Sequence, residues 1–251
     1  MPTPFMHLHT AELILGHDGL TPVARKGITA ERSAFLLGNI APDFQVLYEI
    51  PRQHTHFYEL PPRDDEPPYC KMLSQYPSLA EASLLDLTQS VFLAGYMVHL
   101  LLDWRWYQKI LIPYFVDSGN WSGRRQRFVA HTALLTYMDG KSLARLSADV
   151  SSELAEANPG PWLPFAERAQ LEGWQGYVAE QLLPGAEIKT TAIFARRLGL
   201  AAEELVARLQ DPDWMQSELF TRVPEGAVVA HLHDGVDASV ALLNDYLALH
   251  V

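Results

Sequence analysis

The fold of this 251-residue chain is decided by residues 95–103, which read GYMVHLLLD. They lie in a longer stretch, Leu79–Phe115, in which apolar residues recur at spacings of three and four, a pattern that predicts a helix. Pro113 is expected to end or kink that helix. Its most apolar part, Val91–Leu102, is too short to cross a bilayer and is typical of a helix buried in a protein core.

The same helical periodicity continues through most of the chain, and no segment shows the alternation of a strand. We therefore expect an all-α multi-helix bundle in a single domain, residues 1–251. Further helices are predicted over Thr10–Leu15, Thr29–Leu37, Arg124–Met138, Ser142–Ala157, Pro164–Leu182, Thr191–Leu209 and Val228–Leu249.

One segment, Ile40–Ser78, departs from the helical pattern because it carries seven prolines and an acidic run at residues 64–66. A connection of this length in a compact domain is usually either functional or disordered. Its aromatic residues, among them Phe44, Tyr48 and Phe57, argue against disorder. We therefore expect a long, ordered, proline-rich loop.

The composition limits the partners of the protein. Lys and Arg number 19 against 30 Asp and Glu, a net charge of −11, which disfavours extended binding of nucleic acid. Cys70 is the single cysteine, so an intramolecular disulfide is excluded. The N-terminal residues lack the basic and apolar regions of a secretory signal, from which we expect a cytoplasmic protein without a transmembrane segment.

A basic cluster stands out in this acidic chain at Arg124, Arg125 and Arg127. Arginine offers a planar fork of donors that matches a phosphate group. Charged residues at the start of a helix are more often simply solvated. Both interpretations remain open for this cluster.

His99 and Asp103 form the clearest pair of functional candidates. Their i, i+4 spacing places both side chains on the same face of one helix. Their neighbours are apolar, so the carboxylate requires a partner. A divalent cation is one such partner, and a buried hydrogen bond between the two residues is the alternative.

Two further residues can complete a metal site. Asp43 follows a predicted helix directly and can point back into the bundle, and His56 lies in the proline-rich segment. Two carboxylates and two imidazoles form a ligand set suited to zinc, or to manganese or iron.

The order of these residues resembles that of the zinc-dependent phospholipase C family, whose fold is shared with P1-type single-strand nucleases. The matching pieces are Met6-His7-Leu8, Ile40-Ala41-Pro42-Asp43, His56-Phe57-Tyr58 and Gly95–Asp103. The resemblance covers roughly residues 1–140, the expected metal-binding core. Residues 141–251 are expected to form additional helices that cover the bundle.

The resemblance implies a set of roles for these residues. Asp43, His56, His99 and Asp103 would bind one zinc, and His7 would bind a second, with Asp103 bridging the two. A metal-activated water would attack a phosphoester, with Asp43 as the candidate base. The implied substrate is a small phosphoester or a phospholipid-like molecule.

The sequence also departs from the family pattern. The family carries a further histidine shortly after the bridging aspartate, where this chain has Tyr107 and Lys109. The family's H-x-x-x-E pair on the next helix becomes His131 followed by Leu135. A third metal position is therefore expected to be lost, unless His131, Asp139, His231 or His233 replaces the missing ligands.

These observations favour a zinc-dependent phosphoesterase with one or two metal ions. The departures keep open an alternative, a metal-stabilised helical binding or scaffold protein without catalytic activity. A third possibility is a single-strand nuclease-like hydrolase, which shares the metal site but is disfavoured by the net charge of −11.

Overall fold

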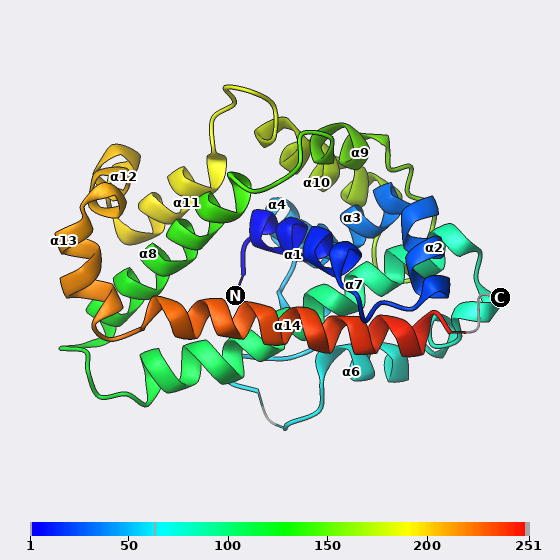
Figure 1. Ribbon diagram of the computed structural model, residues 1–251, viewed down its shortest axis with the longest axis horizontal. Helices are drawn as coiled ribbons and strands as arrows, with labels where there is room; N and C mark the ends of the chain where they lie inside the picture. Colours follow the sequence, from blue (N-terminus) through cyan, green and yellow to red (C-terminus); the bar gives the residue numbers. More distant parts are fainter. Residues whose placement is uncertain (1, 63, 249–251) are drawn as a thin grey trace.

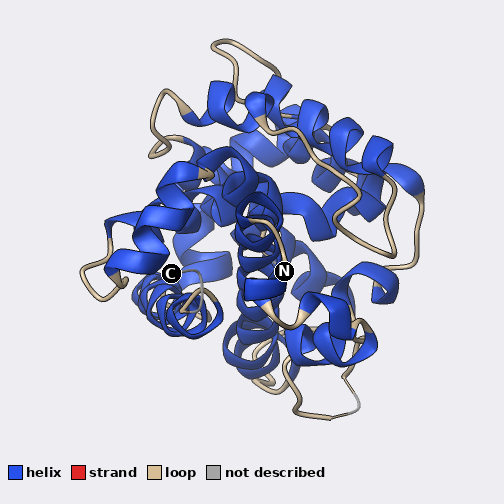
Figure 2. Ribbon diagram, turned by 90° about the vertical axis from the view of Figure 1, so that its right-hand side faces the viewer, coloured by secondary structure: helices blue, strands red, loops and turns tan. Residues whose placement is uncertain are grey.

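The computed structural model describes residues 2–62 and 64–248. The elements formed by these residues are all helical, and none of them is a strand (Figures 1 and 2). The main helices are α1 (Pro4–Gly16), α2 (Pro22–Ala30), α3 (Arg32–Ile40), α6 (Pro68–Gln75), α7 (Leu87–Trp106), α8 (Arg124–Leu143), α9 (Val150–Glu156), α10 (Arg168–Gln181), α11 (Lys189–Leu198), α12 (Ala202–Gln210) and α14 (Glu225–Tyr246). The shorter helices are α4 (Gln45–Tyr48), α5 (Gln53–His56) and α13 (Pro212–Trp214). Three 3₁₀ turns, η1 (Ala41–Phe44), η2 (Pro77–Leu79) and η3 (Ala82–Leu84), and two π-helical segments, η4 (Tyr107–Val116) and η5 (Met215–Phe220), complete the described elements. The all-α bundle expected from the sequence is confirmed.

The central helix of the bundle is α7. Every residue from Ser90 to Trp104 is buried, so α7 is enclosed on all sides, as its nearly continuous apolar sequence predicts. It packs against α3, α6 and α14, and α1 lies against α3, α8 and α14. In Figure 1 the long α14 crosses the front of the molecule, with α1 and α7 behind it.

The closest crossing in the core joins α3 to α7 at two glycines. A Cβ atom at Gly38 would lie 2.1 Å from the carbonyl oxygen of Phe92, and one at Gly95 would lie 2.5 Å from that of Phe35. Since these distances are far below van der Waals contact, no larger residue fits at either position without moving a backbone.

The segment Leu79–Phe115, predicted as one helix, consists of the helix α7 with the 3₁₀ turn η3 before it and the π-helical segment η4 after it. Its regular part begins at Leu87 because the Asp86 carboxylate caps it, accepting a hydrogen bond from the Gln89 N–H at 2.8 Å. After Trp106 the chain continues as the π-helical segment η4, which includes Pro113 and ends at Val116.

Several other predicted boundaries were wrong. The segment 191–209 is two helices, because Gly199 adopts φ +69° after Leu198 and ends α11. The segment 142–157 is not one helix: its first two residues end α8, and α9 begins only at Val150. The proline-rich segment 40–78 is ordered where it is described, but it consists largely of short helical elements rather than a loop. None of the described helices is long and apolar enough to cross a membrane.

Gly38→Ala is expected to lower the free energy of unfolding by about 3 kcal/mol, because the added methyl group collides with backbone and forces α3 away from α7. Urea unfolding followed by circular dichroism measures the change. Gly176→Ala is the matched control, since Gly176 lies in α10 with open space around its Cβ position. The control is expected to raise stability by about 0.5–1 kcal/mol. Equal stability of Gly38→Ala and the wild type would contradict the required crossing.

Candidate metal centre

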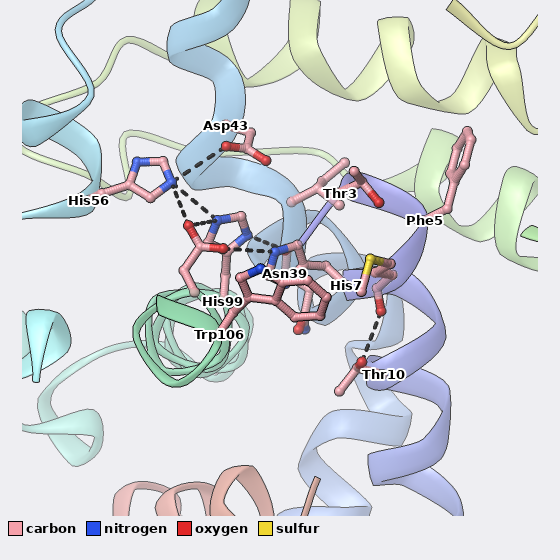
Figure 3. A network of polar contacts seen from close by, with 12 residues as sticks. Thr3, Phe5, His7, Thr10, Asn39, Asp43, His56, His99 and Trp106 are labelled. Carbon is pink, nitrogen blue, oxygen red and sulfur yellow. Dashed lines mark hydrogen bonds and ion pairs between the residues drawn. The ribbon is translucent and has the colours of Figure 1, made fainter. Parts of the chain in front are cut away.

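Five side chains from four segments meet beside the α3–α7 crossing (Figure 3). His7 comes from α1, Asp43 from the turn η1 and His56 from the short helix α5, while His99 and Asp103 lie one turn apart on α7. The three imidazoles and Asp103 are buried, and Asp43 is 18% exposed. The structure thus brings together all five residues that the sequence singled out.

The ligand atoms form two groups that share His99. One group contains His7, His99 and Asp103, and the other contains Asp43, His56 and His99; in each, the candidate atoms lie within 4.8 Å of one another. The two oxygens of Asp103 face different histidines. Oδ1 lies 3.6 Å from His7 Nε2, and Oδ2 lies 3.4 Å from His56 Nε2. Asp103 is therefore placed between the two groups.

The hydrogen bonds of His99 and His56 determine which ring nitrogen carries the proton. His99 Nδ1 lies 2.8 Å from the carbonyl oxygen of Asn39, which can only accept, so Nδ1 carries the proton. His56 Nδ1 lies 2.8 Å from the Thr55 hydroxyl, which donates its own proton to the Arg52 carbonyl oxygen at 3.3 Å. The Nε2 atoms of both rings are therefore left with lone pairs.

These two lone pairs face each other, because His99 Nε2 and His56 Nε2 are 3.3 Å apart. Burial lowers the pKa of His99 to about 3, and burial with the nearby Arg52 charge also lowers the pKa of His56. Neither ring therefore becomes protonated near neutral pH. Two facing lone pairs with carboxylate oxygens beside them fit a divalent cation.

His7 is available to a metal as well. Its ring stacks on that of His99, with centroids 3.8 Å apart and an interplanar angle of 11°. Neither of its nitrogens has a hydrogen-bond partner among the described residues, although the side chain is fully buried. A buried imidazole without partners is unfavourable unless a ligand satisfies it.

Both carboxyl groups of the cluster are held in the ionised form. Burial alone would raise the pKa of Asp103, but its contact with His7 and the charge of Arg52 hold that pKa well below the usual range. The pKa of Asp43 is lowered as well, because its interactions with the neighbouring His56 and His99 side chains outweigh the effect of burial. Ionised carboxylates are the form that binds metals.

Sequence reasoning missed Arg52, which ion-pairs with Asp103 Oδ2 and lies over the Tyr58 ring with its guanidinium carbon 4.8 Å from the centroid. Its side chain is 24% exposed, and its NH1 has no hydrogen-bond partner in the described part of the chain. No local pattern signals this role, because Arg52 and Asp103 are 51 residues apart in the chain.

A cavity of about 330 Å³ opens next to the cluster. Asp43 and Arg52 line its inner side, together with Leu135 of α8. Side chains from α10 and α11 form much of the remaining wall, namely Trp174, Tyr177, Gln181, Ile193, Phe194 and Arg197. The more exposed of the two carboxylates thus faces space in which a small molecule fits.

The residues named for a third metal position do not form a ligand group in the described part of the chain. Lys109 is exposed, and Leu135 lines the cavity. His131 Nε2 accepts a hydrogen bond from the Trp106 indole at 3.1 Å. Asp139 accepts hydrogen bonds from the Thr3 hydroxyl and the Phe5 N–H. His231 lies against the Trp106 ring, and His233 is exposed. Neither ligand group found among the described residues includes any of them.

The helical fold and the buried histidine–aspartate cluster together define a class: all-α proteins built around a candidate metal centre on a central helix. The sequence model for zinc dependent phospholipase C matches residues 6–164. Because this match covers more than half of the chain, the protein belongs to the zinc-dependent phospholipase C family. No curated protein and no solved structure matches the chain.

The family match confirms the resemblance carried by the short motifs and extends beyond it. It reaches residue 164, whereas the resemblance was expected to cover roughly residues 1–140. It includes α9 but stops before α10 and α11, the two helices that contribute much of the cavity wall.

Asp139 is expected to make stability depend on pH. Burial raises the pKa of its carboxyl from 3.8 to about 7, only partly offset by its hydrogen bonds with Thr3 and Phe5. Because the folded-state pKa is raised, this stabilisation is fully present below pH 3.8 and is lost as the pH rises through 7. Asp139→Asn, which keeps an acceptor oxygen but cannot ionise, is expected to remove this loss.

Urea unfolding of both proteins at pH 5, 6, 7 and 8 with saturating zinc tests this dependence. The wild type is expected to lose stability relative to Asp139→Asn by on the order of 1 kcal/mol per pH unit up to about pH 7. Parallel pH profiles for the two proteins would show that the carboxyl does not titrate in this range.

Proposed function

We propose that the protein is a zinc-dependent hydrolase of phosphoesters. The observation that carries the proposal is the pair of lone pairs on His56 Nε2 and His99 Nε2, 3.3 Å apart, with oxygens of Asp43 and Asp103 beside them. Membership of the zinc-dependent phospholipase C family supports zinc as the metal. Manganese and iron accept the same donor types and are distinguished by elemental analysis.

The five clustered residues are proposed to hold one or two zinc ions. Asp43, His56, His99 and Asp103 would hold the first, and His7 with Asp103 would hold the second. Asp103 suits the bridging role because its two oxygens face different histidines. When bound, zinc lowers the pKa of a coordinated water and offsets negative charge on a phosphoester.

Asp43 is proposed to be the base that accepts a proton from the attacking water. Its lowered pKa keeps the carboxylate ionised, and its position on the cavity wall places it beside the incoming substrate. Arg52 lines the same cavity and has an unpartnered NH1 group. It is proposed to bind an oxygen of the substrate phosphate.

The substrate is proposed to be a small phosphoester or a phospholipid-like molecule. The cavity of about 330 Å³ is near the lower end of the size range of ligand sites, and aromatic side chains of Trp174, Tyr177 and Phe194 contribute to its wall. These walls favour an apolar group attached to the phosphate. The net charge of −11 disfavours a long polyanion in the same position.

His56→Gln is expected to reduce zinc below about half of the wild-type content and to lower phosphodiester hydrolysis by at least ~10²-fold. Elemental analysis of protein purified without added metal or chelator measures the first quantity. His54→Gln is the matched control, because His54 is an exposed residue of the same helix. It is expected to keep both properties.

The outcomes separate the proposed function from its alternative. Full zinc content and full turnover in His56→Gln would contradict the metal centre. Tight zinc binding in the wild type, without turnover on any phosphomonoester or phosphodiester, would contradict the hydrolase and favour a metal-stabilised scaffold protein.

Arg52→Lys is expected to leave the zinc content unchanged and to lower kcat/KM by about 10–100-fold, because lysine lacks the bidentate fork of arginine. Steady-state kinetics with a chromogenic phosphodiester, together with elemental analysis, measure both effects. Unchanged kinetics would show that Arg52 serves only as the charge partner of Asp103.

A further inference from the structure

A second and larger cavity lies away from the metal centre, between η4 and the first turns of α8. Its volume is about 620 Å³, and no residue of the metal centre lines it. Apolar side chains contribute much of its wall, namely Leu111, Phe115, Val116 and Phe128. A hollow of this size with mainly apolar walls has the character of a ligand site.

Two of these apolar residues remain in contact with solvent. Val116 is 46% exposed and Phe128 is 48% exposed, and both border the cavity. Such exposure at the edge of an apolar hollow leaves unfavourable surface that an apolar ligand would cover.

Three cationic side chains, Arg124, Arg125 and Arg127, line the same cavity. They occupy the first turn of α8, which contains no acidic residue. The partial positive charge of a helix N-terminus opposes cations at this position, so the helix itself does not favour them there.

The three arginines also lack charge partners within the described chain. No carboxylate of residues 2–62 or 64–248 forms an ion pair with any of them. Arg127 reaches only a backbone oxygen, that of Val116, at 3.4 Å. In a protein of net charge −11, an unpaired cationic cluster beside an apolar cavity is complementary to an anionic ligand.

The wall of the cavity also contains a histidine. His131 borders it, and its Nε2 is occupied by the hydrogen bond from Trp106, while its ring packs edge-on against Phe115 with centroids 4.9 Å apart. The wall of the cavity therefore combines three cationic side chains with apolar and neutral ones.

We propose that this cavity binds one molecule of an anionic lipid, with its carboxylate or phosphate head on Arg124, Arg125 and Arg127 and its acyl chain against Leu111, Phe115 and Phe128. The apolar walls account for the chain, and the arginine forks account for the head. The site is separate from the metal centre and does not depend on the proposed hydrolase activity.

Isothermal titration of the full-length protein with oleate and with 1-oleoyl lysophosphatidate, below their micelle concentrations, tests the proposal. At least one of them is expected to bind with a Kd below about 100 µM, and the tighter of the two identifies the preferred head group. The double variant Arg124→Gln/Arg125→Gln is expected to weaken binding at least ~10-fold, and Phe128→Ser is expected to weaken it as well.

Two control variants test whether the loss of lipid binding is specific to this cavity. Arg196→Gln changes an exposed arginine that does not line the cavity and is expected to bind as the wild type does. Arg52→Lys, which changes the lining of the cavity beside the metal centre, is also expected to bind the lipid normally, and this separates the two cavities. Arg124, Arg125, Arg196 and Phe128 are exposed, so circular dichroism is expected to show unchanged folding when they are substituted.

Three results would overturn the proposal. The first is no binding of either lipid by the wild type, and the second is equal binding by the wild type and the double arginine variant. The third is binding only to vesicles that contain about 30% phosphatidylglycerol, without binding of the monomeric lipids, which would indicate membrane docking instead of a single-molecule site.

Discussion

The contact on which the metal centre depends is the close crossing of α3 and α7. Gly38 and Gly95 allow the two backbones to touch, and this brings the carbonyl oxygen of Asn39 to 2.8 Å from His99 Nδ1. That single hydrogen bond determines the tautomer of His99 and directs its other nitrogen toward the cluster. The same crossing places Asp43, four residues after Asn39, beside the ligands of α7.

The electrostatics of the cluster follow from its burial. An apolar bundle disfavours charged imidazoles, so His56 and His99 remain neutral and keep their lone pairs. The same burial would favour neutral carboxyl groups, but Asp103 stays ionised because His7 and Arg52 are close to it. Neutral imidazoles and ionised carboxylates in one buried space are the protonation states that zinc requires of its ligands.

The residues that match the family and the residues beyond the match contribute different parts of the site. The matched residues 6–164 contain all five clustered side chains, whereas α10 and α11 beyond the match contribute much of the wall of the adjacent cavity. The candidate metal ligands and much of the wall of the adjacent cavity therefore come from different parts of the chain. The larger cavity beside η4 is lined by arginines and apolar residues, and no candidate metal ligand lines it.

The sequence by itself determined the helical class, because apolar residues spaced three and four apart lie on one face of a helix, which can then be buried. It also determined the five clustered residues, since the i, i+4 pair His99 and Asp103 is visible along one helix and the order of the short motifs matches a family. Tertiary structure alone decided the role of Arg52, the carbonyl partner of His99 and the walls of the cavities. A backbone carbonyl that accepts a hydrogen bond is not marked by any residue type in the sequence. The placement of residues such as Asp43 and Phe194 around one cavity depends on helix packing, which local periodicity does not encode.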